Sequence, residues 1–450
     1  MKKAQKKTVE NITTKDVKIE GSMGEGDTNE MLENKEVIRE EVTLQIEVIQ
    51  EGKGYALLES EAEGEKKTET GEEKDNEKNQ LVGDLIGKEN KTWKSCQPKT
   101  HVMFLKTHKT GSSTVQNIIF RYAERENLSL ALPKNRFTHL LNYPRNFSAD
   151  FVKQTATGQK FDILANHMRF NFPEVLKVMH DDTFYFSILR HPIPTVKSVF
   201  MYWNTDTEIF RNSKDLNEFM KFPLSYYKLN YTKNYYAKNL MWFDFGLNHN
   251  HVDDEDYFEA AISWIESTFN LILISEYFEE SMILLKEALC WSMDDVTYFV
   301  LNKRSKASTQ NLTQETISRI KEWNSLDWKL YLHFNKTFWR KIKENIGLEQ
   351  MNRKVQLLKQ KNKELKNTCL QNSKATDPAN VISNMFLPFQ PNKAKIQGYN
   401  LKTDLNNITK HQCQRMILTE RWYSKLIYNK QFSNLSIQYQ IDNYNEDTSK

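Results

Sequence analysis

The chain has 450 residues, of which 39% are hydrophobic and 12% aromatic, and its formal net charge is +4. This is enough apolar chain to bury a sizeable core, and the 9 Trp, 19 Tyr and 25 Phe residues exclude a fibrous or wholly disordered protein. The overall basic excess is too weak to indicate binding to nucleic acid.

Residues 1–95 differ in charge from the rest of the chain. They hold 16 Lys or Arg and 23 Asp or Glu, whereas the other residues hold 47 basic and 36 acidic side chains. With Tyr55 as the single aromatic residue before Trp93, this segment cannot bury enough apolar surface to offset the entropy of ordering. We predict a disordered acidic arm over residues 1–95, followed by a basic folded region that suits an anionic ligand.

Beyond the arm, apolar runs of strand length alternate with segments of helical spacing. The predicted strands cover residues 101–106, 161–165, 183–189 and 269–274, and a predicted helix follows each of them, at 112–126, 173–180, 194–203 and 277–291. Residues 214–266 and 313–346 are expected to be mostly helical, 354–370 to be a basic helix or linker, and 372–450 to be less regular. The alternation predicts an α/β fold with a central parallel sheet flanked by helices.

The turn between the first strand and its helix is the most informative segment. It reads Lys106-Thr-His-Lys-Thr-Gly-Ser-Ser-Thr114. Gly111 allows a sharp turn, and the small hydroxyl residues after it leave backbone N–H groups at a helix N-terminus, where a phosphate or sulfate binds. The order differs from the P-loop consensus because Lys109 precedes the glycine. The alternative is a plain helix cap at Ser112 or Ser113 with basic neighbours.

A second anion site is predicted at the end of the third strand. Arg190 follows that strand at the carboxyl edge of the sheet, where ligands of open α/β folds bind, and Ser198 lies in the next helix. An Arg fork and a hydroxyl suit a second phosphate. Two anion sites at neighbouring strand ends predict a nucleotide with phosphates at both ends of its ribose, as in 3′-phosphoadenylyl sulfate (PAPS).

These segments resemble the galactose-3-O-sulfotransferase family. The resemblance begins at the turn of residues 106–114 and continues, in family order, through Asn166-His-Met-Arg-Phe-Asn171, Ile188-Leu-Arg-His-Pro192, Asn239-Leu-Met-Trp-Phe-Asp-Phe-Gly246, Leu273-Ile-Ser-Glu-Tyr-Phe-Glu-Glu-Ser281, Leu289-Cys-Trp-Ser-Met-Asp-Asp-Val296 and Trp323-Asn-Ser-Leu-Asp-Trp-Lys-Leu-Tyr331. It implies a P-loop-like sulfotransferase fold, PAPS as donor, and transfer of sulfate to the 3-hydroxyl of a galactose on a galactosylceramide-like glycolipid or a glycan. On this basis we divide the chain into the arm, a sulfotransferase domain over 96–350, its C-terminal extension over 351–430 and a polar tail over 431–450.

The resemblance also implies a luminal enzyme of the Golgi membrane. Members of the family carry an N-terminal signal anchor, whereas the acidic arm stands in that place here, and the sequence contains no run of 18 apolar residues. A cytoplasmic location is therefore the alternative.

Two histidines are candidates for the base that takes the proton of the acceptor hydroxyl. His108 lies in the turn beside Lys109, and His167 follows the second strand at the same edge of the sheet. We predict His108, Lys109 and His167 as catalytic residues. The predicted donor-binding residues are Lys106, Thr110, Gly111, Ser112, Ser113, Thr114, Arg190 and Ser198.

No metal is expected, because the four cysteines contain no CxxC pair and sulfuryl transfer does not require an ion. Cys369 and Cys413 could form a disulfide, while Cys96 and Cys290 could equally be buried thiols. Three other functions stay open from the sequence: a sulfotransferase for another acceptor such as a uronic acid, a P-loop-like kinase, and an inactive binding protein. A kinase would place an Asp for Mg²⁺ where this chain has Arg190.

Overall fold

The structure is a computed structural model that describes residues 96–155, 158–252, 254–305, 311–391 and 394–432. The chain divides into two units, Met1–Cys96 and Gln97–Lys450. The predicted arm over 1–95 and nearly all of the predicted tail over 431–450 lie outside the described residues. The arm, the tail and the boundary at residue 350 therefore remain predictions.

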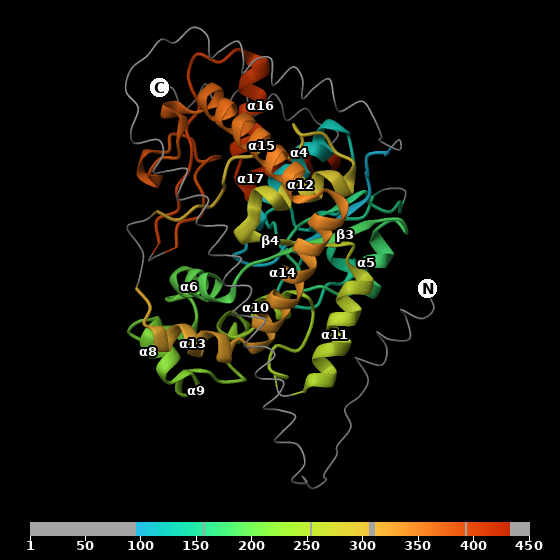
Figure 1. Ribbon diagram of the computed structural model, residues 1–450. Coiled ribbons are helices and arrows are strands. Elements are labelled where there is room, and N and C mark those ends of the chain that lie inside the picture. The colour runs from blue at the N-terminus through green and yellow to red at the C-terminus, as the bar shows by residue number, and fades with distance from the viewer. Residues whose placement is uncertain (1–95, 156–157, 253, 306–310, 392–393, 433–450) are drawn as a thin grey trace. The chain divides into compact units, whose positions relative to one another are not determined.

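Four parallel strands form the sheet of the second unit (Figure 1). Their order is β2-β1-β3-β4, and their bounds are Val102–Leu105 for β1, Ile163–Leu164 for β2, Phe184–Leu189 for β3 and Leu271–Ile274 for β4. Every strand residue is buried, as expected of nearly continuous apolar runs in a sheet that is covered on both faces. The one polar member, Ser187, donates its hydroxyl to the carbonyl of Leu105 on the neighbouring strand.

A helix follows each strand, which confirms the predicted α/β fold. These helices are α4 (Ser112–Arg125), α5 (Phe172–Val178), α6 (Pro192–Trp203) and α12 (Phe278–Leu289). In α4 the apolar positions Val115, Ile118, Ile119 and Tyr122 are all buried, so the 3.6-residue period faces the core as predicted. Because the four strands are parallel, their carboxyl ends all lie at the same edge of the sheet.

The two long segments are mostly helical, as expected, but each is divided into shorter helices. The described residues of 214–266 form four α-helices, namely α8 (Leu216–Lys221), α9 (Pro223–Tyr226), α10 (Leu240–Asp244) and α11 (Glu255–Thr268). Lys233 and Asn239 have φ angles of 64° and 47°, and a helix cannot continue through that conformation. Residues 313–346 likewise form two helices, α13 (Gln314–Trp323) and α14 (Ser325–Asn345), because the chain leaves helical geometry at Asn324.

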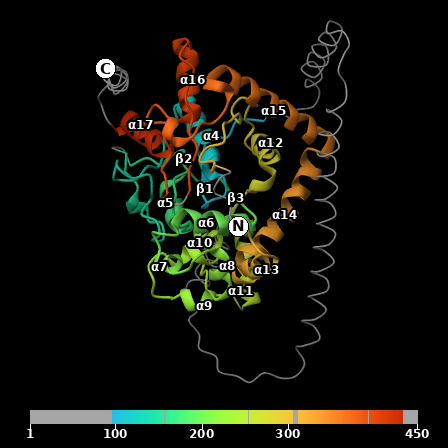
Figure 2. The same cartoon turned by 90° about the vertical axis from the view of Figure 1, so that its left-hand side faces the viewer.

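A second, smaller apolar core is formed by helices that lie between β3 and β4 in the chain together with α13, which follows β4. Val199 of α6, Phe210 of α7 (Glu208–Arg211), Phe219 of α8 and Ile320 of α13 are among its buried members. Figures 1 and 2 both show α6, α8 and α13 grouped together beside the sheet. This helical layer holds α6 in place, and α6 carries the predicted Ser198.

The C-terminal region is more regular than predicted. It contains α15 (Leu348–Cys369), α16 (Asn407–Ile417) and α17 (Glu420–Phe432), and the last two pack against α4 (Figure 2). Glu124 of α4 accepts hydrogen bonds from Arg415 Nε at 3.0 Å and from the Tyr423 hydroxyl at 2.8 Å. These helices depend on partners almost 300 residues away, which explains why local sequence did not reveal them.

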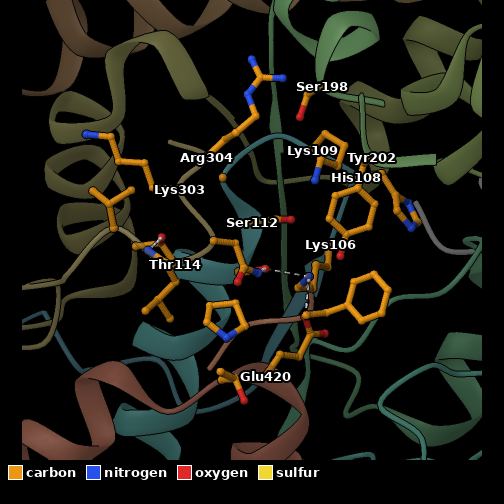
Figure 3. A pocket seen from close by; sticks show the side chains of 18 of the residues that line it. Lys106, His108, Lys109, Ser112, Thr114, Ser198, Tyr202, Lys303, Arg304 and Glu420 are labelled. Carbon is orange, nitrogen blue, oxygen red and sulfur yellow. Dashed lines mark hydrogen bonds and ion pairs between the residues drawn. The ribbon is translucent and has the colours of Figure 1, made fainter. Parts of the chain in front are cut away.

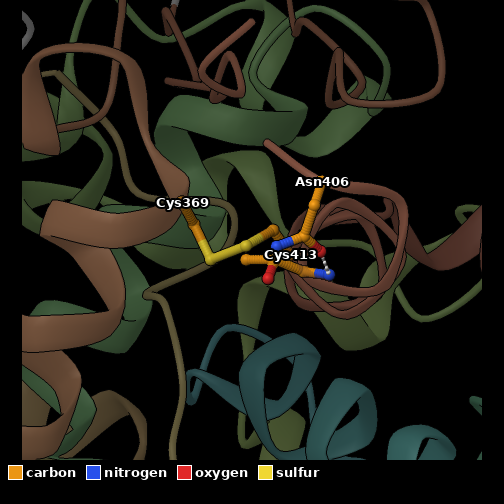
Figure 4. The surroundings of a disulfide bond; sticks show 4 residues. Cys369, Asn406 and Cys413 are labelled. Atoms are coloured by element: carbon orange, nitrogen blue, oxygen red, sulfur yellow. Dashed lines mark hydrogen bonds between the residues drawn. A yellow bond between two sulfur atoms is a disulfide. The ribbon is translucent and has the colours of Figure 1, made fainter. Parts of the chain in front are cut away.

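A disulfide joins Cys369, at the end of α15, to Cys413 in α16 (Figure 4). This confirms the predicted bond, which closes a loop with a sequence separation of 44 and stabilises the fold by about 3–4 kcal/mol on a chain-entropy estimate. Cys96 and Cys290 are also disulfide-bonded, so the alternative of buried thiols is excluded. Structural disulfides are typical of an oxidising, luminal compartment. Among the described residues, no helix has the length and apolar character needed to span a membrane.

Candidate active site

A cavity of about 1240 Å³ opens at the carboxyl edge of the sheet (Figure 3). The residues that directly follow β1, β3 and β4 line it, and these are Lys106, Arg190 and Ser275. His167, three residues beyond β2, lines it as well. The topology thus brings the predicted site residues of separate strands to one place, as expected for an open parallel sheet.

The turn before α4 offers backbone N–H groups to the cavity. Gly111 caps the helix with φ of 80°, and an added Cβ would lie 3.4 Å from the ring of Phe278. The first turn of α4 contains no acidic side chain that would compete with an anion. The Thr114 hydroxyl accepts a hydrogen bond from the backbone of Leu301, so it can still donate to a ligand.

Three basic side chains lie at this turn: Lys109 within it, and Arg190 and Arg304 beside it. Arg190 donates to the carbonyl of Lys109 at 2.9 Å, and the Lys109 ammonium lies 3.7 Å from the centre of the Tyr202 ring. Burial, together with the charges of Arg190, Lys106 and Arg304, lowers the pKa of Lys109 to about 7. Nη1 of Arg304 is buried and has no hydrogen-bond partner in the described part of the chain. Unshared positive charge of this kind calls for an anionic ligand.

His108 is held by a buried carboxylate. Its backbone N–H donates to Asp244 Oδ2 at 2.7 Å, and its ring Nδ1 lies 3.0 Å from Oδ1. Because Nδ1 faces a carboxylate, it carries the ring proton, and Nε2 is left as the hydrogen-bond acceptor. Asp244 therefore fixes both the orientation and the tautomer of His108.

Asp244 is itself fixed from two sides. The Tyr143 hydroxyl donates to Asp244 Oδ1 at 2.9 Å. Asp327 of α14 accepts the backbone N–H groups of Met241 and Trp242 and so anchors the start of α10, which ends at Asp244. This network extends from α14 through α10 to the turn that follows β1.

His167 and Lys106 form a separate buried group. His167 donates from Nδ1 to the carbonyl of Lys106 at 2.8 Å, and its Nε2 accepts from the Lys106 ammonium at 2.7 Å. The ammonium also pairs with Glu420 at 3.1 Å. Burial, helped by the Lys106 charge, lowers the pKa of His167 well below its usual value. The rings of His108 and His167 stack with their centres 4.1 Å apart.

The structure gathers nearly all the predicted site residues. The exception is Thr110, which is fully buried and bonds the side chain and carbonyl of Thr107 within the turn. Ser112 lines the cavity but donates its hydroxyl to the Thr107 carbonyl at 2.6 Å, so its contribution to a ligand is its backbone N–H. The predicted residues that line the cavity are Lys106, His108, Lys109, Gly111, Ser112, Ser113, Thr114, His167, Arg190 and Ser198.

Sequence reasoning missed three charged residues of this site. Asp244 is the single acidic residue in the apolar run of residues 240–245. An acid in such a run is expected to be buried, and a buried acid needs a polar or charged partner. Arg304 and Glu420 carry no comparable signal, because both lie in polar segments far along the chain. Their contribution follows from the tertiary fold.

A group of possible metal ligands lies near the starts of β1 and β2. His101 and His180 each place Nε2 3.5 Å from Asp162 Oδ1. The two rings stack with centres 4.0 Å apart and planes 15° apart. Two nearly parallel planes at that spacing cannot both contain one ion about 2 Å from each nitrogen, so we interpret the group as an ion-pair cluster.

The fold and the cavity together define an α/β protein with clustered basic side chains at the carboxyl edge of its sheet and an adjacent histidine–carboxylate pair. The model of the galactose-3-O-sulfotransferase family matches residues 76–431. Galactose-3-O-sulfotransferase 2 of Mus musculus is 44% identical over 340 residues, covering 74% of this chain and 86% of its own length. Galactosylceramide sulfotransferase of Homo sapiens is 36% identical over 332 residues (73% and 78%), and galactose-3-O-sulfotransferase 4 of Bos taurus is 33% identical over 410 residues (75% and 84%).

The chain belongs to the galactose-3-O-sulfotransferase family. Its activity is that of a galactose 3-O-sulfotransferase, with a galactose on a glycolipid or a glycan as acceptor. The resemblance drawn from the motifs is thereby confirmed.

Proposed function

We propose that the enzyme takes its sulfuryl group from PAPS, and that the cationic cavity at the start of α4 is the donor site. The observation that carries this proposal is the buried Nη1 of Arg304, which has no hydrogen-bond partner among the described residues, beside Arg190 and Lys109. Three basic side chains gathered in one cavity fit a ligand with several negative charges. PAPS supplies a sulfuryl group attached to its 5′-phosphate and carries a further phosphate on the 3′ position.

The donor site has two parts in this proposal. The backbone N–H groups of residues 112 and 113 and the Lys109 ammonium hold the 5′-phosphosulfate, since a helix N-terminus and a cation both favour negative charge. Arg190, Ser198 and Arg304 hold the 3′-phosphate. Lys109 also stabilises the charge that develops on the leaving 5′-phosphate oxygen.

We further propose His108 as the general base. Its Nε2 makes no hydrogen bond to any described residue, so the lone pair is available to take the proton of the galactose 3-hydroxyl. As the oxygen loses that proton it gains the sulfuryl group, and the nucleotide leaves as adenosine 3′,5′-bisphosphate. Asp244 stabilises the imidazolium that forms. The lone pair of His167 is already engaged by the Lys106 ammonium, which supports a positioning role for His167.

We also propose that the enzyme works in the Golgi lumen at the membrane. The luminal part of this proposal is supported by the disulfides, and galactose-bearing acceptors are built in that compartment. Localisation of the tagged full chain by microscopy, with protease protection to establish its side of the membrane, tests it.

The test of the function uses the purified full chain with its disulfides oxidised. With PAPS and a terminal β-galactoside we expect one sulfate per galactose, and no product from the matched 3-deoxygalactoside. A glucuronide acceptor and ATP with Mg²⁺ are run in parallel. Sulfation of the glucuronide alone, or phosphate transfer from ATP, would contradict the proposed transfer of sulfate from PAPS to galactose.

The depressed pKa of Lys109 predicts a pH dependence of donor binding. Without ligand, Lys109 is mostly charged below pH 7 and mostly neutral above it. A bound polyanion favours the charged form, so binding above pH 7 takes up a proton, and the affinity for adenosine 3′,5′-bisphosphate falls by up to about tenfold per pH unit from pH 7 toward pH 9. Calorimetry in buffers of different ionisation enthalpy measures both the affinity and the proton uptake.

The control is Lys109→Met. This variant should bind adenosine 3′,5′-bisphosphate more weakly, and its affinity should change little between pH 7 and pH 9. Phosphate groups titrate near pH 6, so the range above pH 7 isolates the lysine. If the affinity falls equally steeply with pH in the parent enzyme and in Lys109→Met, Lys109 is not the group that causes the pH dependence.

A further inference from the structure

An aromatic wall lies beside His108 in the cavity. Trp203, the last residue of α6, stacks on Tyr236 with ring centres 4.0 Å apart and planes 16° apart. Both rings lie edge-on to His108, with centres 5.9 Å from its ring, and both line the cavity. Both side chains are partly exposed, so a ligand can reach them.

Tyr202 and Trp203, two consecutive residues of α6, have different neighbours in the cavity wall. Tyr202 lies under the Lys109 ammonium at 3.7 Å, whereas the same ammonium is 5.6 Å from the Trp203 ring. Trp203 turns toward His108 and Tyr236 instead. The cation is therefore nearer to Tyr202 than to Trp203, and the wall beside His108 is mainly aromatic, which suits a neutral ligand.

The chemistry of a galactose ring fits this aromatic wall. Galactose is neutral, and its axial 4-hydroxyl leaves the C3–H, C4–H and C5–H bonds exposed on one face as an apolar patch. Aromatic side chains offer a large rigid apolar surface to such a face at little cost in conformational entropy. The hydroxyls at the ring edge would then remain free for polar groups such as His108.

We propose that Trp203, supported by Tyr236, is the platform on which the acceptor galactose packs, so that its 3-hydroxyl faces His108 Nε2. This inference rests on the proposed function and adds the residue that binds the sugar. It assigns the aromatic stack to the acceptor, while the donor depends on the cations. Trp203 is then a determinant of acceptor affinity and contributes nothing to donor affinity.

The experiment compares Trp203→Ala and Trp203→Phe with the parent enzyme in the full chain. The acceptor is a soluble β-galactoside, and adenosine 3′,5′-bisphosphate binding is measured separately by calorimetry. We expect Trp203→Ala to raise the KM for the galactoside at least tenfold and to leave the bisphosphate Kd within twofold. Trp203→Phe should recover part of the loss.

Trp339→Ala is the matched control, because Trp339 is a half-buried tryptophan of α14 that does not line the cavity. It should leave the galactoside KM unchanged, and thermal melts of all variants report on folding. An unchanged KM in Trp203→Ala, or an equal loss of galactoside and bisphosphate affinity, would overturn the platform. If the parent enzyme itself fails to turn over a galactoside, the proposed function has failed, and that result is distinct from a failure of the platform.

Discussion

His108→Gln should lower kcat by about a thousandfold and leave the affinity for adenosine 3′,5′-bisphosphate within threefold. A positioned general base contributes about 10²–10⁴-fold to rate, and Gln cannot take a proton. The donor contacts belong to the cations and to the start of α4, so donor binding should survive. Steady-state kinetics with a galactoside, combined with calorimetry on the same preparation, measures the two effects independently.

The companion variants decide which histidine is the base. Asp244→Asn keeps the shape of the buried side chain but removes the charge that orients His108, and we expect it to lower kcat about a hundredfold. His167→Gln should cost less than His108→Gln, because His167 contacts Lys106 through both nitrogens. A larger loss of kcat in His167→Gln, with an intact thermal melt, would reverse the assignment.

The strands were predictable because each is a short buried apolar run. The sequence pattern gave the correct strand count and helix partners for the described region, although β2 is shorter than expected. Residue 161 was expected in that strand, but it pairs with Met179 through an isolated bridge. Boundaries of this kind depend on the neighbouring segments and therefore escape a local reading.

The site was predictable only where it follows the strands. His108 and Arg190 lie next to strand ends, so topology alone brings them together. Asp244 reaches His108 from 136 residues along the chain, and Glu420 reaches Lys106 from the start of α17. Both depend on how helices pack outside the sheet, and no spacing in the sequence records that packing.

The helices of the C-terminal region show the same limit. Residues 407–432 mix polar and apolar side chains, and we expected this stretch to be less regular. They become helical because α16 and α17 cover α4, where the Glu124 carboxylate bonds Arg415 and Tyr423. Tertiary contacts of this strength override local propensity.

Arg190→Ala should weaken binding of adenosine 3′,5′-bisphosphate about a hundredfold. A hydrogen bond to a charged group contributes about 1.5–3 kcal/mol, and the loss of the guanidinium also leaves the 3′-phosphate short of one positive charge. The more specific expectation concerns adenosine 5′-monophosphate, which lacks the 3′-phosphate. The parent enzyme should prefer the bisphosphate strongly, and in Arg190→Ala the two affinities should converge.

Two controls separate this effect from a loss of structure, because Arg190 also donates to the carbonyl of Lys109 in the turn. Arg319→Ala removes an exposed guanidinium that pairs with Glu315 away from the cavity, and it should leave both nucleotide affinities unchanged. Arg190→Lys retains the charge without the planar fork and should show an intermediate loss. Were Arg190→Ala to weaken the two nucleotides by the same factor, Arg190 would be acting on the turn and the 5′ end, and the 3′-phosphate contact would have to be reassigned to Arg304.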